Sequence, residues 1–317
     1  QSTSLSSADK MMLDVITDSQ AEHQSLSQAV TEIIRSLEGD TPSAMSVIKV
    51  TSHADGREID LFTETIARSF INRLLELHIK DYDRMETVKE RIQNNALLIV
   101  SKVMSINEIE KCLVSFSFES QRKLLIVLLG ETFPLKLMLD IMWRKFILNV
   151  HVVHRESTNG DVKLNTYFPF TKDSCGQVHP VVWNIYRNGA FVTQQREVFP
   201  LKTQNFFYCA LSVAVFNAPP YMIVLNKTGT IEVDGVDGKV LQTLSKELKF
   251  SITYVVVSDD YRWGEIHGNQ SATGATKLVS RNKDEIQHSI SFLSKRSSTI
   301  LSISLSACSP KQIEENF

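Results

Sequence analysis

The sequence predicts an α/β fold arranged as two units joined by a short linker. Three observations lead to this prediction. The length of 317 residues corresponds to about two domains. Apolar strand patterns alternate with amphipathic helix patterns up to residue 154. The sequence then becomes rich in turns, and a second set of strand and helix patterns begins near Phe206.

The first unit is predicted from apolar residues at helical or strand spacing. Residues 1–20 are polar and are expected to fray. Asn107 is a suitable N-cap for one of the helices. Helices are expected at residues 24–37, 59–77, 107–116 and 135–146, and strands at residues 47–50, 96–103, 124–129 and 147–154. This alternation predicts a parallel sheet covered on both faces.

The segment at residues 157–200 has a different character, with Asn-Gly turn signals at Asn159 and Asn188 and short β-rich pieces between them. Residues 200–205 form the expected linker. The second unit is expected to contain a buried strand at 206–216, strands at 221–225 and 252–257, and a helix at 239–248. Asp237 is the expected cap of that helix, and Gly238 would allow a close turn.

Composition excludes several classes of protein. The apolar share of 43% and charged share of 22% are those of a globular chain. A net charge of −2 argues against a nucleic-acid-binding protein. The sequence holds no run of about 18 apolar residues that could span a membrane as a helix. The chain begins at Gln1 rather than Met, which is compatible with removal of a signal segment.

Enzyme signatures are missing from the sequence. It contains no Gly-x-Ser-x-Gly, His-Glu-x-x-His or Gly-x-Gly-x-x-Gly motif, and Gly238-Lys239 lacks the remainder of a phosphate-binding loop. The turn around Asp234 and Asp237 invites a calcium interpretation, but the further oxygen ligands and the distal Glu are missing. We therefore expect neither enzymatic activity, nor a cofactor, nor a metal site.

Cysteines and glycosylation signals bear on the compartment. Four cysteines are widely spaced, which fits either one or two disulfides in an oxidising compartment or four buried thiols. Sequons occur at Asn226 and Asn269, both in expected turns of the second unit, and predict glycosylation outside the cell. The cysteines are Cys112, Cys175, Cys209 and Cys308.

An ordered set of motifs lies between residues 218 and 274. It consists of a strand opening with Pro-Pro-Tyr, a Gly-x-Asp-Gly turn, a helix ending in Leu-x-Phe, and later Trp-Gly and Thr-Gly pairs. This set resembles the first ligand-binding segment of ionotropic glutamate receptors, and it is most similar to the chemosensory ionotropic receptors of insects. The motifs are Ala218-Pro219-Pro220-Tyr221, Gly235-Val236-Asp237-Gly238, Leu248-Lys249-Phe250, Trp263-Gly264 and Thr273-Gly274.

The resemblance implies a periplasmic-binding-protein-like fold, with residues 1–205 as an amino-terminal extracellular α/β domain and residues 206–317 as part of the first lobe of a clamshell ligand-binding domain. It implies the ligand-sensing part of a ligand-gated cation channel subunit, at the extracellular side of the cell membrane. The ligand would be a small acid or amine, and the partners would be co-receptor subunits in a hetero-oligomer. Pore helices are absent, so the chain is expected to be a fragment or a short isoform.

The same resemblance implies the ligand-binding residues. Arg296 matches the arginine that pairs with the carboxylate of the ligand, and Ser291 takes the place of a pocket threonine. Ser289 stands where the family has a proline. A guanidinium offers a rigid pair of donors for a carboxylate. The alternative is that Lys295 and Arg296 are a solvated pair on a loop, and Trp263 is interpreted as a packing residue rather than a ligand contact.

Two other functions remain open from the sequence. The chain could be a secreted or periplasmic-type solute-binding module that uses a related clamshell. It could instead be a structural co-receptor subunit that binds no ligand, which would be favoured if Arg296 lay outside the pocket.

Overall fold

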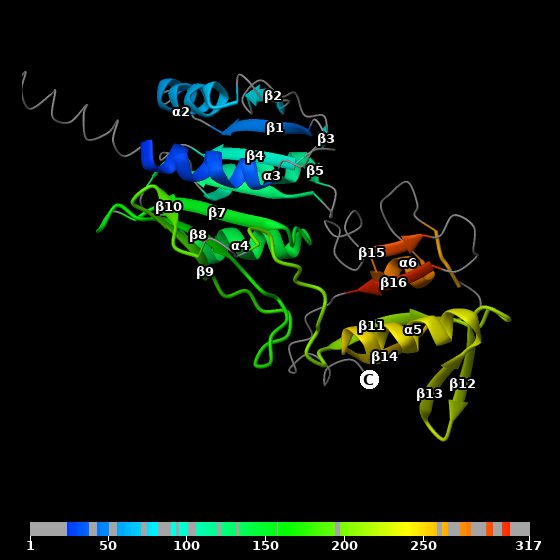
Figure 1. The fold of residues 1–317 in the computed structure, drawn as a ribbon. Helices are drawn as coiled ribbons and strands as arrows, with labels where there is room; N and C mark the ends of the chain where they lie inside the picture. Colours follow the sequence, from blue (N-terminus) through cyan, green and yellow to red (C-terminus); the bar gives the residue numbers. More distant parts are fainter. Residues whose placement is uncertain are drawn as a thin grey trace, which may run out of the picture. The chain divides into compact units, whose positions relative to one another are not determined.

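The computed structural model divides the chain into two compact units (Figure 1). The first contains residues 1–142, 147–167 and 180–200, and the second contains residues 143–146, 168–179 and 201–317. The structure describes residues 24–37, 43–50, 56–70, 75–81, 90–92, 95–100, 106–118, 122–130, 133–156, 158–193, 197–258, 262–265, 273–279, 290–293 and 300–304.

A mixed sheet of eight strands forms the centre of the first unit. Its strands, in spatial order, are β10 (Ala190–Phe191), β9 (Val181–Arg187), β8 (Val162–Thr166), β7 (Val150–Arg155), β6 (Leu124–Leu128), β4 (Asn95–Val100), β1 (Ser43–Val50) and β2 (Leu75–Asp81). The strands from β2 to β7 are parallel, as expected from the alternation with helices. The strands from β7 to β10 are antiparallel, and the Asn188-Gly189 signal lies between β9 and β10.

Both faces of this sheet are buried. The helix at residues 24–37 and α2 (Gly56–Arg68) supply apolar side chains to one core cluster, together with alternate residues of the strands. The remaining alternate residues of β4 and β6, such as Leu98 and Ile126, are also fully buried. Helix α4 (Leu135–Arg144) buries Met138 and Met142. Burial on both faces explains why these strands read as continuous apolar runs.

Several expected element boundaries in the first unit are wrong. The helical stripe at residues 59–77 covers two elements, because α2 ends at Arg68 and Leu75–Asp81 forms strand β2. Apolar residues in a strand can continue a helical spacing by coincidence over one turn. Helix α3 (Ile106–Ser115) begins before Asn107, so Asn107 lies in its first turn and is not its cap. The small parallel pair β3 (Glu90–Ile92) and β5 (Phe116–Phe118) was not expected.

The second unit contains a four-stranded sheet in the order β14 (Ser251–Val256), β11 (Ala210–Val215), β16 (Ile300–Ser304) and β15 (Ile290–Leu293). Strand β14 is parallel to β11, whereas β16 is antiparallel to both of its neighbours. A hairpin of β12 (Ile223–Lys227) and β13 (Thr230–Asp234) leads directly into α5 (Gly235–Leu248). A short helix, α6 (Gly274–Val279), follows the Thr-Gly pair.

Two expectations in the second unit are corrected by the backbone. The predicted strand at 206–216 is shorter, because Phe207 and Tyr208 have positive φ values of 51° and 62° and form a turn before β11. Helix α5 begins at Gly235, and its N-cap is Asp234, whose carboxylate accepts a hydrogen bond from Gly235 N. Asp237, the expected cap, lies in the first turn of this helix.

A disulfide joins Cys175 to Cys209, which settles the choice between thiol and disulfide for this pair. Aromatic rings pack beside it within the same unit. Phe206 lies 4.6 Å from Phe170 and 5.7 Å from Phe250, measured between ring centroids. Of the other two cysteines, Cys112 lies in α3 and Cys308 lies outside the described residues.

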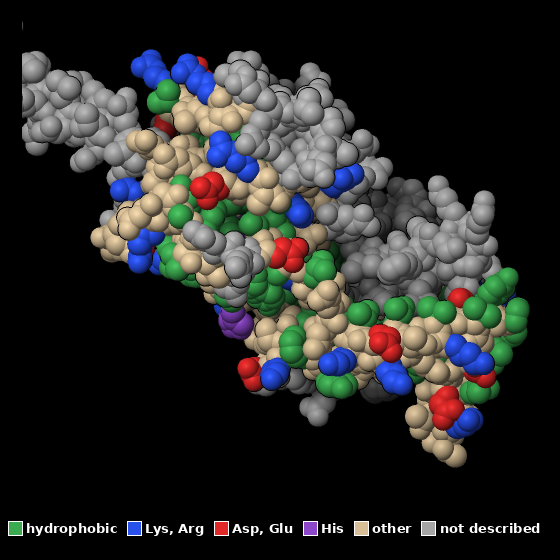
Figure 2. Space-filling view, in the orientation of Figure 1, with side chains coloured by type: hydrophobic (Ala, Val, Ile, Leu, Met, Phe, Trp, Pro, Cys, Tyr) green, Lys and Arg blue, Asp and Glu red, His purple; other side chains and the backbone are tan. Residues whose placement is uncertain are grey.

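Charged side chains of both signs lie on the surface of the described residues (Figure 2). On the face shown there, basic and acidic side chains are interspersed over each unit rather than gathered into one patch of a single charge. Among the described residues, no helix has both the length and the apolar character needed to cross a membrane.

Candidate functional site

The residues predicted to bind the ligand fall mostly outside what the structure describes. Arg296, Ser289 and the sequon residue Asn269 lie outside the described residues. Ser291 is in strand β15, where its backbone pairs with Ser302 of β16. Asn226 is exposed near the end of β12, beside the turn of the β12–β13 hairpin.

Strand register locates the two described residues that flank the segment containing Arg296. The chain enters the segment that contains Arg296 from Leu293 of β15 and leaves it at Ile300 of β16, and these two residues are paired. Strand β16 is antiparallel to β11, with Ile303 opposite Val213. Leu293 and Ile300 therefore lie at the end of the sheet where β11 finishes and Phe216 follows.

A cavity of about 340 Å³ opens at that same end of β11, where the Pro-Pro-Tyr segment follows the strand. Phe216 is 5% exposed, and its ring makes an edge-to-face contact with Trp263 at 4.6 Å between centroids. Trp263 thus packs on the core and also lines the cavity. The lining residues are Phe216, Asn217, Ala218, Pro219, Tyr221, Arg262 and Trp263.

Helix α5 holds the Tyr221 side of this cavity in place. The first backbone N–H groups of a helix have no partner within the helix. Here Val236 N donates to Pro220 O at 3.3 Å, and Asp237 N donates to Tyr221 O at 2.9 Å. Gly235 permits this close approach, because a Cβ at that position would lie 2.5 Å from Tyr221 O. The Gly-x-Asp-Gly motif therefore serves to position the Pro-Pro-Tyr segment.

The Trp-Gly and Thr-Gly pairs are joined by backbone hydrogen bonds on the other side of the cavity. Thr273 N donates to Glu265 O, and Glu265 N donates to the Thr273 hydroxyl, both at 3.0 Å. Ala275 N donates to Arg262 O at 2.9 Å. Gly264 is in contact with this segment, since a Cβ there would lie 1.6 Å from Thr273 O. These contacts fix the backbone that carries Arg262 and Trp263.

The cavity combines aromatic surface with one cation. Tyr221 and Trp263 offer ring faces, and the exposed guanidinium of Arg262 offers donors suited to a carboxylate. Asn217 is partly engaged, because its side-chain oxygen accepts a hydrogen bond from Val224 N at 3.3 Å. Such a site can hold a small organic anion with an apolar part.

Arg262 was not singled out by sequence reasoning, which followed the family pattern to Arg296. A signal was present, because Arg262 directly precedes the Trp263-Gly264 pair that the resemblance had identified. The structure shows that this pair approaches Phe216 and the Thr273-Gly274 pair, which the sequence separates by many residues.

The fold and cavity define an α/β protein of the periplasmic-binding-protein-like, ligand-binding class. Residues 16–205 match the family described as “Putative ionotropic receptor, ligand binding domain”, and the chain belongs to this family. No curated protein matches the sequence. The matched residues include the whole eight-stranded sheet of the first unit, whereas the motif set at residues 218–274 lies beyond them.

Proposed function

We propose that this chain is the extracellular, ligand-sensing part of a chemosensory ionotropic receptor, a ligand-gated cation channel subunit that responds to small organic acids. Membership of the ionotropic receptor ligand-binding family supports the ligand-sensing role. In this proposal residues 1–205 are the amino-terminal domain and residues 206–317 are part of the first lobe of the ligand-binding clamshell. The receptor acts at the cell membrane with co-receptor subunits.

The observation that carries the acid specificity is the cavity beside Tyr221. It has a cationic side chain, Arg262, and three aromatic side chains, those of Phe216, Tyr221 and Trp263, at its wall. Arg296 belongs to the connection between β15 and β16, whose ends lie at the same end of the sheet. A carboxylate that enters the cavity meets the guanidinium of Arg262, which can bind it bidentately, while its apolar part packs on the rings. Ser291 and Ser289 complete the proposed set of ligand contacts.

The extracellular location is supported by the Cys175–Cys209 disulfide, because such bonds persist in oxidising compartments. We propose that Asn226 and Asn269 carry glycans. Asn226 is exposed in the β12–β13 hairpin, so its side chain is accessible to glycosylation. Glycosidase treatment of the chain secreted from insect cells should lower its mass, and the Asn226→Gln variant should lose part of that change.

The acid specificity is tested in a full-length receptor that contains this chain, by recording currents evoked by short carboxylic acids and by the matched amines. Arg262→Gln and Arg296→Gln should each reduce the sensitivity to acids by at least about tenfold, because a charge-assisted hydrogen bond contributes about 1.5–3 kcal/mol. Lys295→Gln is the matched control, since it removes a neighbouring cation and should leave the response intact.

Distinct outcomes identify which part of the proposal fails. A loss with Lys295→Gln equal to that with Arg296→Gln would mean that the pair acts only through general charge. An unchanged acid response in both arginine variants would remove the acid site from this end of the sheet. A receptor that responds to amines alone would keep the family and contradict the acid specificity.

A further inference from the structure

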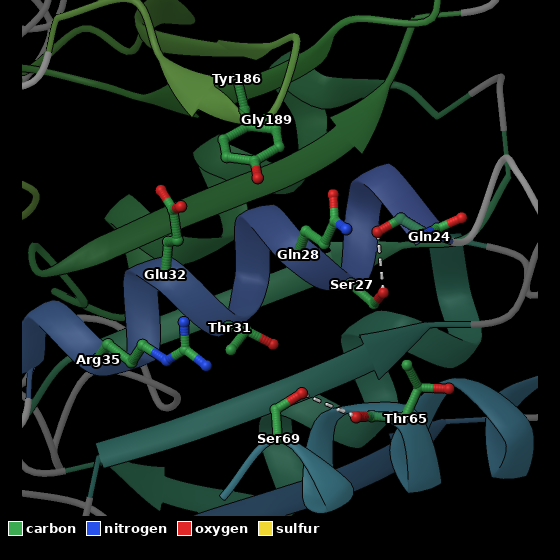
Figure 3. A pocket seen from close by; sticks show the side chains of 10 residues that line it. All are labelled: Gln24, Ser27, Gln28, Thr31, Glu32, Arg35, Thr65, Ser69, Tyr186 and Gly189. Atoms are coloured by element: carbon green, nitrogen blue, oxygen red, sulfur yellow. Dashed lines mark hydrogen bonds between the residues drawn. The ribbon is translucent and has the colours of Figure 1, made fainter.

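A second cavity, of about 510 Å³, lies within the first unit beside the helix at residues 24–37 (Figure 3). This helix forms one wall, and the other walls come from α2 and β9 with the turns that follow them. The lining consists of hydroxyl, amide and charged side chains and one glycine. Most small-molecule sites are instead lined mainly by apolar side chains. An occupant of this cavity therefore has to carry polar groups over most of its surface.

Tyr186 of β9 presents a hydroxyl group to this cavity. The residue is only 4% exposed, and its ring packs edge to face on Phe191 at 5.2 Å between centroids. Its phenol oxygen is directed toward the helix (Figure 3) and makes no hydrogen bond to any residue that the structure describes. A buried hydroxyl without a hydrogen bond costs free energy. The cavity is therefore the place where water or a ligand bonds to this hydroxyl.

Thr31 shows the same pattern on the side of the helix nearer Ser69 (Figure 3). It lines the cavity and is 5% exposed, and among the described residues its hydroxyl also has no hydrogen-bond partner. The hydroxyls of Ser27 and Thr65 differ, because each donates to a backbone carbonyl of its own helix, at 3.0 and 2.8 Å. The hydroxyls of Tyr186 and Thr31 are thus available to an occupant of the cavity.

Glu32 and Gln28 extend from the helix on the side that faces Tyr186 (Figure 3). Glu32 is half-buried and Gln28 is exposed, and neither side chain makes a hydrogen bond to a described residue. An ionised carboxylate only accepts hydrogen bonds, whereas an amide and a phenol both donate and accept them. These three side chains therefore suit a ligand with several hydroxyl groups, some of which donate to Glu32 while others bond to the amide and the phenol.

The charges around the cavity favour a neutral ligand. Arg35 lines the cavity three residues after Glu32, so the lining carries one negative and one positive side chain. Both charges act on Tyr186: burial is the main cause that raises its pKa, the negative charge of Glu32 raises it further, and the positive charge of Arg35 opposes this. The two charges therefore oppose each other at the same hydroxyl, and no net charge selects an ionic ligand.

We propose that this cavity binds a small neutral sugar. The carboxylate of Glu32 accepts hydrogen bonds from two adjacent sugar hydroxyls, and Gln28 and Tyr186 bond to further hydroxyls. The volume lies within the range of small-molecule sites. The site shares no residue with the cavity beside Tyr221, so it is independent of the acid sensing proposed above.

Calorimetry on the full chain compares sugars that share the glucose ring. D-Glucose or maltose should bind saturably with a Kd on the order of 10 mM or lower, and glucose with every hydroxyl methylated should bind at least about tenfold more weakly, because it donates no hydrogen bond. D-Glucosamine and D-glucuronate add a positive and a negative charge to the same ring. A preference of about tenfold or more for either charged sugar, equal binding of the methylated sugar, or no saturable binding of both D-glucose and maltose would overturn the proposal.

Variants locate the binding. Glu32→Gln should weaken the binding of the sugar by at least about tenfold, and Tyr186→Phe by at least about threefold. Glu64→Gln and Tyr208→Phe are the matched controls, because Glu64 forms an exposed ion pair with Arg68, Tyr208 is 71% exposed, and neither lines the cavity. Equal losses in the control variants would mean that the sugar binds elsewhere.

Thermal unfolding separates ligand binding by Tyr186 from a structural role. Because its hydroxyl has no partner in the described residues, Tyr186→Phe should leave the midpoint without sugar unchanged and should reduce the rise in midpoint that the sugar causes. A lower midpoint without sugar, together with an unchanged rise, would mean that the hydroxyl serves the fold alone and would contradict the proposed contact. Arg262→Gln should leave sugar binding unchanged, whereas a loss in that variant would assign the sugar to the cavity of the second unit and overturn this inference.

Discussion

Replacing Gly264 by alanine should open the backbone clamp between the Trp-Gly and Thr-Gly pairs. Gly264 has a φ of +74°, and an added Cβ would lie 1.6 Å from Thr273 O and 2.2 Å from Thr273 C. The obstructing atoms are backbone atoms, so no side-chain rotation relieves the overlap. The three hydrogen bonds that join residues 262–265 to residues 273–275 must therefore break or shift.

The magnitude follows from these contacts. An alanine with positive φ is less stable than glycine by about 1–2 kcal/mol. Each of the three hydrogen bonds contributes about 0.5–1.5 kcal/mol. Gly264→Ala should thus destabilise this local structure by about 3–6 kcal/mol, which is a large part of the stability of a typical domain.

Gly229→Ala is the matched control in the same unit. Gly229 has a φ of +85° in the β12–β13 turn, and an added Cβ there would meet no atom within 4 Å. This variant carries the conformational penalty alone, about 1–2 kcal/mol. The difference between the two variants isolates the contact with Thr273 from the effect of positive φ.

Hydrogen exchange measured by mass spectrometry distinguishes the two variants. In Gly264→Ala, the amides of Thr273 and Ala275 should exchange at least about 100-fold faster, while the strands of the first unit keep their protection. Near-equal exchange in the Gly264→Ala and Gly229→Ala proteins would refute the clamp. The acid response of a receptor with Gly264→Ala should also fall, because Arg262 and Trp263 lose their fixed backbone.

Three further predictions concern the fold. Tyr167→Phe should lower the free energy of unfolding in urea by about 1–3 kcal/mol, since the buried hydroxyl donates to Ile147 O at 2.9 Å; an unchanged midpoint would contradict this. Burial lowers the pKa of Lys202 from 10.5 to about 7, so the free energy of unfolding should rise between about pH 7 and 10. Lys202→Met should remove this pH dependence and should stabilise the protein below pH 7 by up to about 5 kcal/mol. The hydrogen bond from Arg187 lowers the pKa of Asp161, so the stability that it contributes is present at neutral pH and lost as pH falls through that lowered pKa; Arg187→Gln should flatten the acid part of a stability-versus-pH curve.

The central sheet of the first unit could be predicted because burial on both faces produces apolar runs that need no other information. Residues 24–37 and strand β6 were located almost to the residue, since each is bounded by polar or glycine-containing sequence. Strand β2 was missed because its Leu77 continues the helical spacing of α2. Local spacing cannot separate two elements when the second begins in phase with the first.

The two boundary errors in the second unit have different causes: residues with positive φ before β11, and two competing capping residues before α5. Phe207 and Tyr208 are bulky residues that rarely adopt a left-handed conformation, so nothing local predicted a turn before β11. The start of α5 was placed too late because Asp237 is as good a capping residue as Asp234. The choice between them depends on the carbonyl groups of Pro220 and Tyr221, which only the fold brings to the first turn.

The contacts of the candidate site could not be predicted from local sequence either. The motifs that identify the cavity were visible in the sequence, but their contact was not, because Gly264 meets Thr273 through backbone atoms that carry no residue-specific signal. The polar stripe of residues 24–37 was equally visible and would be expected to face water. Only the structure reveals that Ser27 and Thr31 are buried against other elements.

Family membership and the motif set are independent lines of support for ligand sensing. The family match covers residues 16–205, and the Pro-Pro-Tyr, Trp-Gly and Thr-Gly motifs all follow residue 205. An error in the assignment of Arg262 or Arg296 would therefore leave the family unchanged.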